Sequence, residues 1–158
     1  MESSMEIRKA EISEATILSK IAYDSKSFWG YSQELLELWK DDLTITPEFI
    51  TTNVVRCATV KTTIIGFYAL TISDSNFELE HLWIKPSYIG KGAGSKLLAD
   101  ATRQVAVQKG KKLKILTDPN AEGFYLKKGA VRIGKLPSKP AGRMLPLLQL
   151  NVQNIPAV

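Results

Sequence analysis

The sequence predicts an α/β protein built on a mixed sheet, mostly antiparallel with one parallel strand pair, and flanked by helices. Three runs rich in β-branched and aromatic residues follow one another closely, at residues 53–60, 63–72 and 78–84. A long helical pattern then leads to a fourth apolar run at residues 113–117. Because strand–helix–strand connections are right-handed, this last strand should lie parallel to the strand at 78–84.

The N-terminal part is expected to hold a short strand and two helices. The strand covers residues 5–10, and Ser13 is the expected N-cap of the first helix. Apolar residues recur there at helical spacing: Ala15, Leu18, Ile21 and Ala22. A second helical pattern runs from about residue 32 to residue 42, and Pro47 is expected to close the region.

Turn signals separate the remaining elements. Lys61 and Thr62 join the first hairpin, and the long helix after the third strand should extend to about Gln108, with Gly110 as its C′ residue. A short helix is expected between Pro119 and Gly129. Two strands complete the chain, and Pro146 in the last one predicts an edge position or a bulge.

Length and composition are those of one soluble globular domain, so residues 1–158 are expected to form a single domain. No apolar run approaches the roughly 18 residues of a membrane span, and the N-terminus has no apolar signal region. The single cysteine, Cys57, cannot form an internal disulfide. We therefore expect a cytoplasmic protein without a membrane partner.

The net charge of +5 conceals an uneven distribution along the chain. Residues 1–84 hold 7 basic and 13 acidic side chains, whereas residues 85–143 hold 14 basic and 3 acidic ones. A basic half suits a polyanionic cofactor and an acidic half suits a cationic amine, although both could be solvated faces. The basic residues are not interleaved with aromatic ones, which disfavours nucleic-acid binding.

The stretch at residues 78–98 carries the strongest signal for function. A strand ends in a Pro-Ser turn, and a glycine-rich loop then opens the long helix. Such a loop leaves backbone N–H groups open to an anion at the positive end of the helix dipole. Its spacing fits neither the Walker A loop nor the dinucleotide-binding fingerprint.

This loop resembles motif A of the GNAT superfamily of acetyl-CoA-dependent N-acetyltransferases. In the family motif, Gln or Arg begins a glycine-containing run, and here Ile89 departs from that pattern. The resemblance implies that the loop, with the following Ser95, binds acetyl-CoA largely through its main chain. The matching residues are Ile89, Gly90, Lys91, Gly92, Ala93 and Gly94.

A second resemblance to the same family lies at residues 118–130. The family carries Asn and Ala, and then Phe-Tyr-x-Lys-x-Gly-Phe, whereas this chain has Ala130 in place of the last Phe. The resemblance implies that Tyr125 lies near the cofactor sulfur and that Asn120 contacts the pantetheine arm. The matching residues are Asn120, Ala121, Phe124, Tyr125, Lys127 and Gly129.

The resemblance also implies a mechanism, in which an amine attacks acetyl-CoA directly in a ternary complex and no metal takes part. Main-chain groups of residues 82–84 (Leu82, Trp83 and Ile84) would bind pantetheine and polarise the acetyl carbonyl. Tyr125 would protonate the leaving thiolate. The base is left open between Glu78, Glu80 on the same strand face, and a water chain, with His81 as an outsider.

The acceptor is not determined by any motif. In the family, the first two helices form a wall of the acceptor pocket, which makes Phe28, Trp29, Tyr31 and Glu34 the candidate contacts. Aminoglycosides, polyamines, amino acids and protein amines all remain open, and the acidic half favours a cationic small molecule. A non-catalytic acyl-CoA-binding module is the alternative function. The apolar run at residues 144–150 could also pair two copies into a homodimer.

Overall fold

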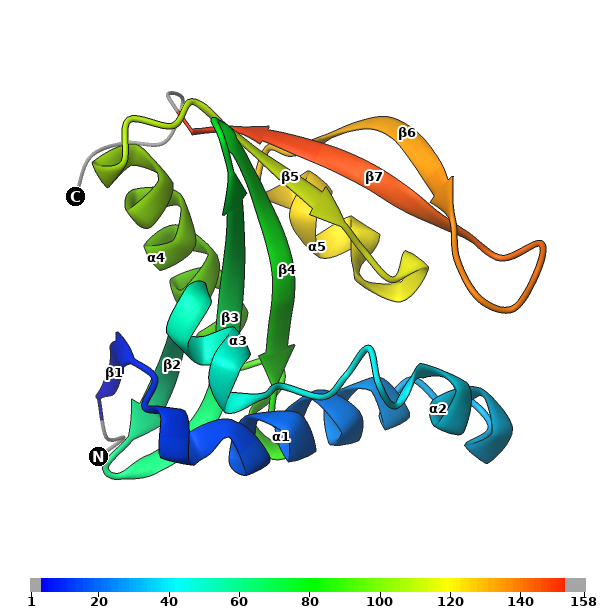
Figure 1. Cartoon of the computed structure of the whole chain (residues 1–158), viewed down its shortest axis with the longest axis horizontal. Helices are drawn as coiled ribbons and strands as arrows, with labels where there is room; N and C mark the ends of the chain where they lie inside the picture. The colour runs from blue at the N-terminus through cyan, green and yellow to red at the C-terminus, as the bar shows by residue number, and fades with distance from the viewer. Residues whose placement is uncertain (1–3, 153–158) are drawn as a thin grey trace. The chain divides into compact units, whose positions relative to one another are not determined.

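The computed structural model describes residues 4–152 and confirms the predicted mixed sheet (Figure 1). Its strands follow the order β1-β2-β3-β4-β5-β7-β6, and β4 pairs with β5 in parallel. The pairs β1–β2, β2–β3, β5–β7 and β6–β7 are antiparallel. The strands are β1 (Met5–Lys9), β2 (Val54–Val60), β3 (Thr63–Ser73), β4 (Asn76–Ile84), β5 (Lys112–Leu116), β6 (Val131–Pro137) and β7 (Met144–Asn151).

Five α-helices and three 3₁₀ turns lie in the described part of the chain. The long helix, α4, leads from the glycine loop toward β5, as the crossover rule requires. The helices are α1 (Ala15–Ser27), α2 (Gln33–Trp39), α3 (Pro47–Thr52), α4 (Ala93–Val107) and α5 (Glu122–Lys127). The 3₁₀ turns are η1 (Ile12–Glu14), η2 (Pro86–Tyr88) and η3 (Pro119–Ala121).

The chain divides into two compact units, which are described separately. The first unit contains the residues up to Leu70 together with His81–Asp100. The second contains Thr71–Glu80 and the residues from Ala101 onward.

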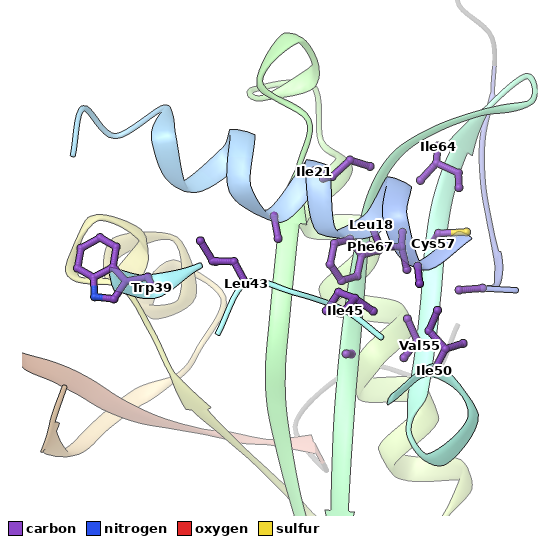
Figure 2. Close-up of a cluster of buried hydrophobic side chains, with 14 of the residues drawn as sticks. Leu18, Ile21, Trp39, Leu43, Ile45, Ile50, Val55, Cys57, Ile64 and Phe67 are labelled. Atoms are coloured by element: carbon purple, nitrogen blue, oxygen red, sulfur yellow. The ribbon is translucent and has the colours of Figure 1, made fainter. Parts of the chain in front are cut away.

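The core of the first unit forms where α1 packs on the sheet (Figure 2). Leu18 of α1 and Phe67 of β3 are completely buried, and Cys57 of β2 lies beside them. Burial raises the pKa of the Cys57 thiol to about 11, so this cysteine stays protonated and serves as a small apolar core residue.

The core of the second unit is held by the antiparallel β5–β7 pair. Leu113 faces Leu150 and Ile115 faces Leu148 across this ladder, and all four side chains are buried. Because inward side chains alternate along a strand, these positions leave Lys112 and Lys114 pointing to the other face of β5.

Two N-terminal expectations were wrong. Pro47 does not close the helical region but begins α3, because Pro suits the first position of a helix and the Thr46 side chain accepts a hydrogen bond from the Phe49 amide. Ser13 is not the N-cap of α1, since it lies inside the 3₁₀ turn η1, and a Glu11–Glu14 capping box opens that turn.

The expected edge position for Pro146 was also wrong. β7 lies between β5 and β6, and β6 is the edge strand. Pro146 faces Lys135 in the β6–β7 ladder, and its carbonyl accepts from the Thr117 amide at 3.1 Å just beyond the last facing pair of β5 and β7, Leu116 and Leu147. The register shift of the β6–β7 pair is in β6, between Arg132 and Gly134.

Gly110 serves a different purpose from the one expected. Lys109, with φ of 63°, is the left-handed residue after α4, and the Gly110 amide donates to the Val105 carbonyl at 2.8 Å. A Cβ atom on Gly110 would lie 2.5 Å from a ring atom of Phe77 and 2.5 Å from a methyl of Val105. Glycine is therefore required here for close packing.

We predict that Gly110→Ala lowers the free energy of unfolding by about 1–3 kcal/mol, because the new methyl group overlaps Phe77 and Val105. Gly134→Ala is the control, since a Cβ atom there meets nothing within 4 Å. It should change stability by less than about 0.5 kcal/mol. Urea unfolding measures both variants, and equal stability of Gly110→Ala and the wild type would contradict the packing role.

Candidate active site

The glycine loop in the first unit has the backbone of an anion-binding loop. Gly90 has φ of 85° and Gly92 has φ of 88°, a conformation that side chains disfavour. Space is not the reason for these glycines, because a Cβ atom on either would meet nothing within 4 Å. The requirement is conformational, and it turns the chain from η2 into α4.

The first turn of α4 directs its amides into this loop. The Lys96 amide donates to the Gly92 carbonyl at 3.2 Å, so the helical amides that precede Lys96 have no acceptor within the helix. These N–H groups and the helix dipole attract negative charge. Ile89 is 39% exposed, and the Lys91 ammonium lies 5.4 Å from the centre of the Tyr88 ring.

A buried carboxylate joins α4 to the sheet of the first unit. The Asp100 carboxylate accepts from Arg56 Nε of β2 at 2.6 Å and from the Tyr68 hydroxyl of β3 at 2.6 Å. Burial is the largest single influence on the pKa of Arg56 and acts to lower it, but the hydrogen bond to Asp100 and the Asp100 charge, with smaller contributions from neighbouring groups, together raise it. The middle of α4 is therefore held to the sheet by a charged contact.

The end of β4 lies close to β3. A Cβ atom on Gly66 of β3 would lie 2.8 Å from the Trp83 carbonyl oxygen, so glycine is needed for this approach. Residues 82–84, the segment expected to bind pantetheine, are half-buried.

His81 of β4 is buried and orients the Trp83 side chain. The Trp83 indole N–H donates to His81 Nδ1 at 2.9 Å, and the rings of Phe49 and Phe67 lie at 5.8 and 6.0 Å from the His81 ring. Burial lowers the pKa of His81 to about 4, although the nearby Asp42 charge acts to raise it. His81 is therefore neutral at pH 7 and acts as a hydrogen-bond acceptor.

The two candidate bases lie in the second unit. Burial alternates along β4, so Glu78 and Glu80 are exposed while Leu79 and His81 are buried. Lys114 of β5 is the register partner of Glu78.

In the second unit, Asp118 organises the segment that carries Asn120. Its Oδ1 atom accepts from the Asn120 backbone amide at 2.8 Å and from Asn120 Nδ2 at 2.9 Å. Its Oδ2 atom accepts from Arg143 at 3.3 Å. The turn of η3 is thus held by side-chain hydrogen bonds, and Arg143 is a supporting residue that no motif indicated.

Tyr125 of α5 is a buried side chain. Its side chain is 5% exposed and packs edge-on against Phe124, with ring centres 5.1 Å apart. Burial raises the pKa of the hydroxyl, which therefore keeps its proton at neutral pH. No hydrogen bond joins this hydroxyl to any other group in residues 4–152. Lys127 is exposed, and Gly129 ends the helix with φ of 100°.

The candidate acceptor residues divide into an exposed set and a packed set. Phe28 and Trp29 are 54% and 41% exposed, and Glu34 is also exposed. Tyr31 instead packs edge-on against Trp39, with ring centres 4.8 Å apart. The buried Lys26 ammonium lies 5.1 Å from the centre of the Tyr31 ring, so an internal cation already faces that ring.

The predicted site residues therefore gather in two groups. The glycine loop, residues 82–84 and the N-terminal aromatic residues belong to the first unit, and the Asn120–Lys127 segment with Glu78 and Glu80 belongs to the second. Among residues 4–152, no group of three or more His, Cys, Asp or Glu side chains could hold a metal ion. No helix in the same range is long and apolar enough to cross a membrane.

Comparison with known proteins decides the family. Residues 30–142 match the acetyltransferase (GNAT) domain. The chain belongs to the GNAT acetyltransferase family. It is also similar to a spermidine N(1)-acetyltransferase of Thermoplasma acidophilum, with 32% identity over 114 residues, which are 63% of this chain and 70% of that protein.

Solved structures of GNAT proteins share the fold. A PaiA N-acetyltransferase from Thermoplasma acidophilum, solved in complex with coenzyme A, has a TM-score of 0.76 at 24% identity, over 94% of this chain and 99% of that one. A GCN5-related N-acetyltransferase from Rhodopseudomonas palustris has a TM-score of 0.81 at 19% identity, over 96% and 98%. The family and the fold predicted from the sequence are both confirmed.

We predict that His81 makes the stability of this GNAT protein depend on pH. Unfolding returns its pKa from about 4 to about 6.5, so the unfolded chain binds the extra proton between these values. Stability should therefore fall as the pH drops from about 6.5 to about 4, by at most ~1.4 kcal/mol per pH unit.

His81→Asn tests this, because Asn keeps an acceptor for the Trp83 indole and does not titrate. Melting temperatures of the two proteins between pH 7 and pH 4 should show a shallower decline for the variant. Parallel curves would mean that His81 is not the group responsible.

Proposed function

We propose that this protein is an acetyl-CoA-dependent N-acetyltransferase that acetylates a primary amine of a cationic small molecule. The observation that carries the proposal is the glycine loop at the start of α4, with Gly90 and Gly92 both left-handed, in a chain of the GNAT family. In this proposal residues 89–95 bind the pyrophosphate of acetyl-CoA through their amides. Residues 1–158 would act as one catalytic domain.

The reaction is a direct displacement. The amine nitrogen forms a bond to the acetyl carbonyl carbon, the carbon–sulfur bond breaks, and the amine gives up a proton. Main-chain groups of residues 82–84 would bind the pantetheine arm and polarise the acetyl carbonyl. The side chains of Asn120, Phe124 and Lys127 would also bind the cofactor. Tyr125 would supply the proton to the leaving thiolate, and the support is that its hydroxyl makes no hydrogen bond within residues 4–152.

An ammonium group has a pKa of roughly 10, close to that of a free lysine side chain. The acceptor must therefore lose a proton before it attacks. Glu78 and Glu80 are proposed for this step, alone or through water, because both carboxylates are exposed on one face of β4. If neither carboxylate acts as the base, water alone would accept the proton of the amine.

A polyamine is the acceptor that we favour. The support is the 32% identity to a spermidine N(1)-acetyltransferase and the acidic N-terminal half of the chain. Phe28, Trp29 and Glu34 are exposed and could contact an alkylammonium chain through aromatic faces and a carboxylate. Tyr31 would contribute only if Lys26 moved from its ring.

We predict that acetyl-CoA raises the melting temperature by several degrees, whereas NAD at equal concentration does not. A ligand at about a hundred times its Kd adds roughly 2.7 kcal/mol of stability. Release of free thiol from acetyl-CoA should then depend on the amine, with spermidine more active than an amino acid or an aminoglycoside.

The thermal-shift and thiol-release results distinguish an acetyltransferase from a non-catalytic acyl-CoA-binding module. A thermal shift without thiol release for any amine would support the non-catalytic acyl-CoA module. No shift at saturating acetyl-CoA would mean that Ile89 abolishes the site and that the proposed function is wrong.

We predict that Tyr125→Phe lowers kcat by about 10²-fold while the Kd for acetyl-CoA changes little, because only proton donation is lost. Tyr23→Phe is the matched control, since that hydroxyl accepts a hydrogen bond from Gln33 in the first unit and lies outside both motifs. Steady-state kinetics and calorimetry give the two constants. Wild-type turnover in Tyr125→Phe would remove Tyr125 from the mechanism.

A further inference from the structure

The second unit contains a lysine-lined pocket of about 400 Å³. The turn between β3 and β4 forms one side of it, and the loop from α4 into β5 lies beside that turn (Figure 1). No residue of the glycine loop contributes. The lining includes Lys109, Lys111, Lys112 and Lys114, together with Asp74, Asn76, Gln108 and Gln149.

The backbone that carries these lysines is well held. The Lys109 amide donates to Ala106 at 2.9 Å, and the Val152 amide donates to the Lys111 carbonyl at 2.9 Å. Gly110 packs directly on the Phe77 ring, and Lys114 faces Gln149 in the β5–β7 ladder. The lysine side chains therefore project from a fixed frame, and a ligand would not have to order the loop.

The charges in the pocket are not balanced by the protein. None of the four lysines makes an ion pair or a side-chain hydrogen bond within residues 4–152, and Asp74 is the one carboxylate in the lining. Other cations of the chain do have partners, such as Arg132 with Glu122 and Arg143 with Asp118. Four ammonium groups around one hollow repel one another, and an anion with several charges would relieve this repulsion.

We propose that this pocket binds a compact polyphosphate, either free or as the phosphate chain of a nucleotide. Its volume is within the usual range for small-molecule sites, roughly 300–1,000 Å³. Lysines act as point charges for phosphate oxygens, and the amide groups of Asn76, Gln108 and Gln149 can donate hydrogen bonds to the same atoms. A monovalent anion would neutralise only one of the four lysines, which favours a ligand with at least three charges.

The test is calorimetric titration with tripolyphosphate and with a nucleoside triphosphate, each in saturating coenzyme A. Lys109→Gln/Lys111→Gln/Lys112→Gln removes three charges from the pocket. The matched control, Lys9→Gln/Lys40→Gln/Lys61→Gln, removes three exposed charges elsewhere, and each set contains one lysine with positive φ. We expect one binding event in the wild type and the control, and at least tenfold weaker binding in the pocket variant.

Stronger binding of tripolyphosphate would indicate a free polyphosphate, and stronger binding of the nucleotide would indicate that the base also contributes. Equal affinity of all three proteins, or no saturable binding to the wild type, would overturn the proposal. The proposal would also be overturned if a single-stranded oligonucleotide bound the same lysines more tightly than tripolyphosphate does. Amine-dependent thiol release by the pocket variant should match the wild type, so failure here is distinguishable from failure of the proposed acetyltransferase function.

Discussion

The Asp100 carboxylate is the contact on which the arrangement of the first unit depends. It is 3% exposed and holds α4 to β2 through Arg56 and to β3 through Tyr68. Removing Arg56 would leave the buried Asp100 charge with less compensation, which destabilises the folded state. The glycine loop leads into the same helix, whose middle is fixed to the sheet by Asp100.

Left-handed backbone occurs at several of the places to which we assign function. Gly90 and Gly92 adopt it before α4, Lys109 adopts it after α4, and Gly129 adopts it after α5. At each point the chain must change direction sharply to present amides or side chains. At the glycines, the absence of a Cβ atom avoids the steric strain of a left-handed backbone. At Lys109 this strain remains, because the glycine of this loop stands at the next position, Gly110, where it packs on Phe77.

Burial lowers the pKa of His81 and raises the pKa of Tyr125, and both groups are neutral at pH 7. His81 loses its charge and accepts the hydrogen bond of Trp83, and Tyr125 retains its proton. The physical cause is the same, since desolvation disfavours the charged form of either group. The surroundings of the two groups differ. The rings of Phe49, Phe67 and Trp83 enclose the His81 ring, whereas the Tyr125 hydroxyl has no hydrogen-bond partner within residues 4–152.

The sequence by itself determined the family, the order of the strands along the chain and the glycine loop, because these depend on local patterns of glycine, β-branched and apolar residues. It also placed Leu18 and Ile21 in the core, since their spacing is helical. The tertiary structure alone decided that β7 is inserted between β5 and β6, and that Gly110 serves close packing. It also decided that Arg56, Asp100 and Tyr68 meet. Those features join residues far apart in the chain, and no local pattern encodes which distant side chain will fill a given space or pair with a given charge.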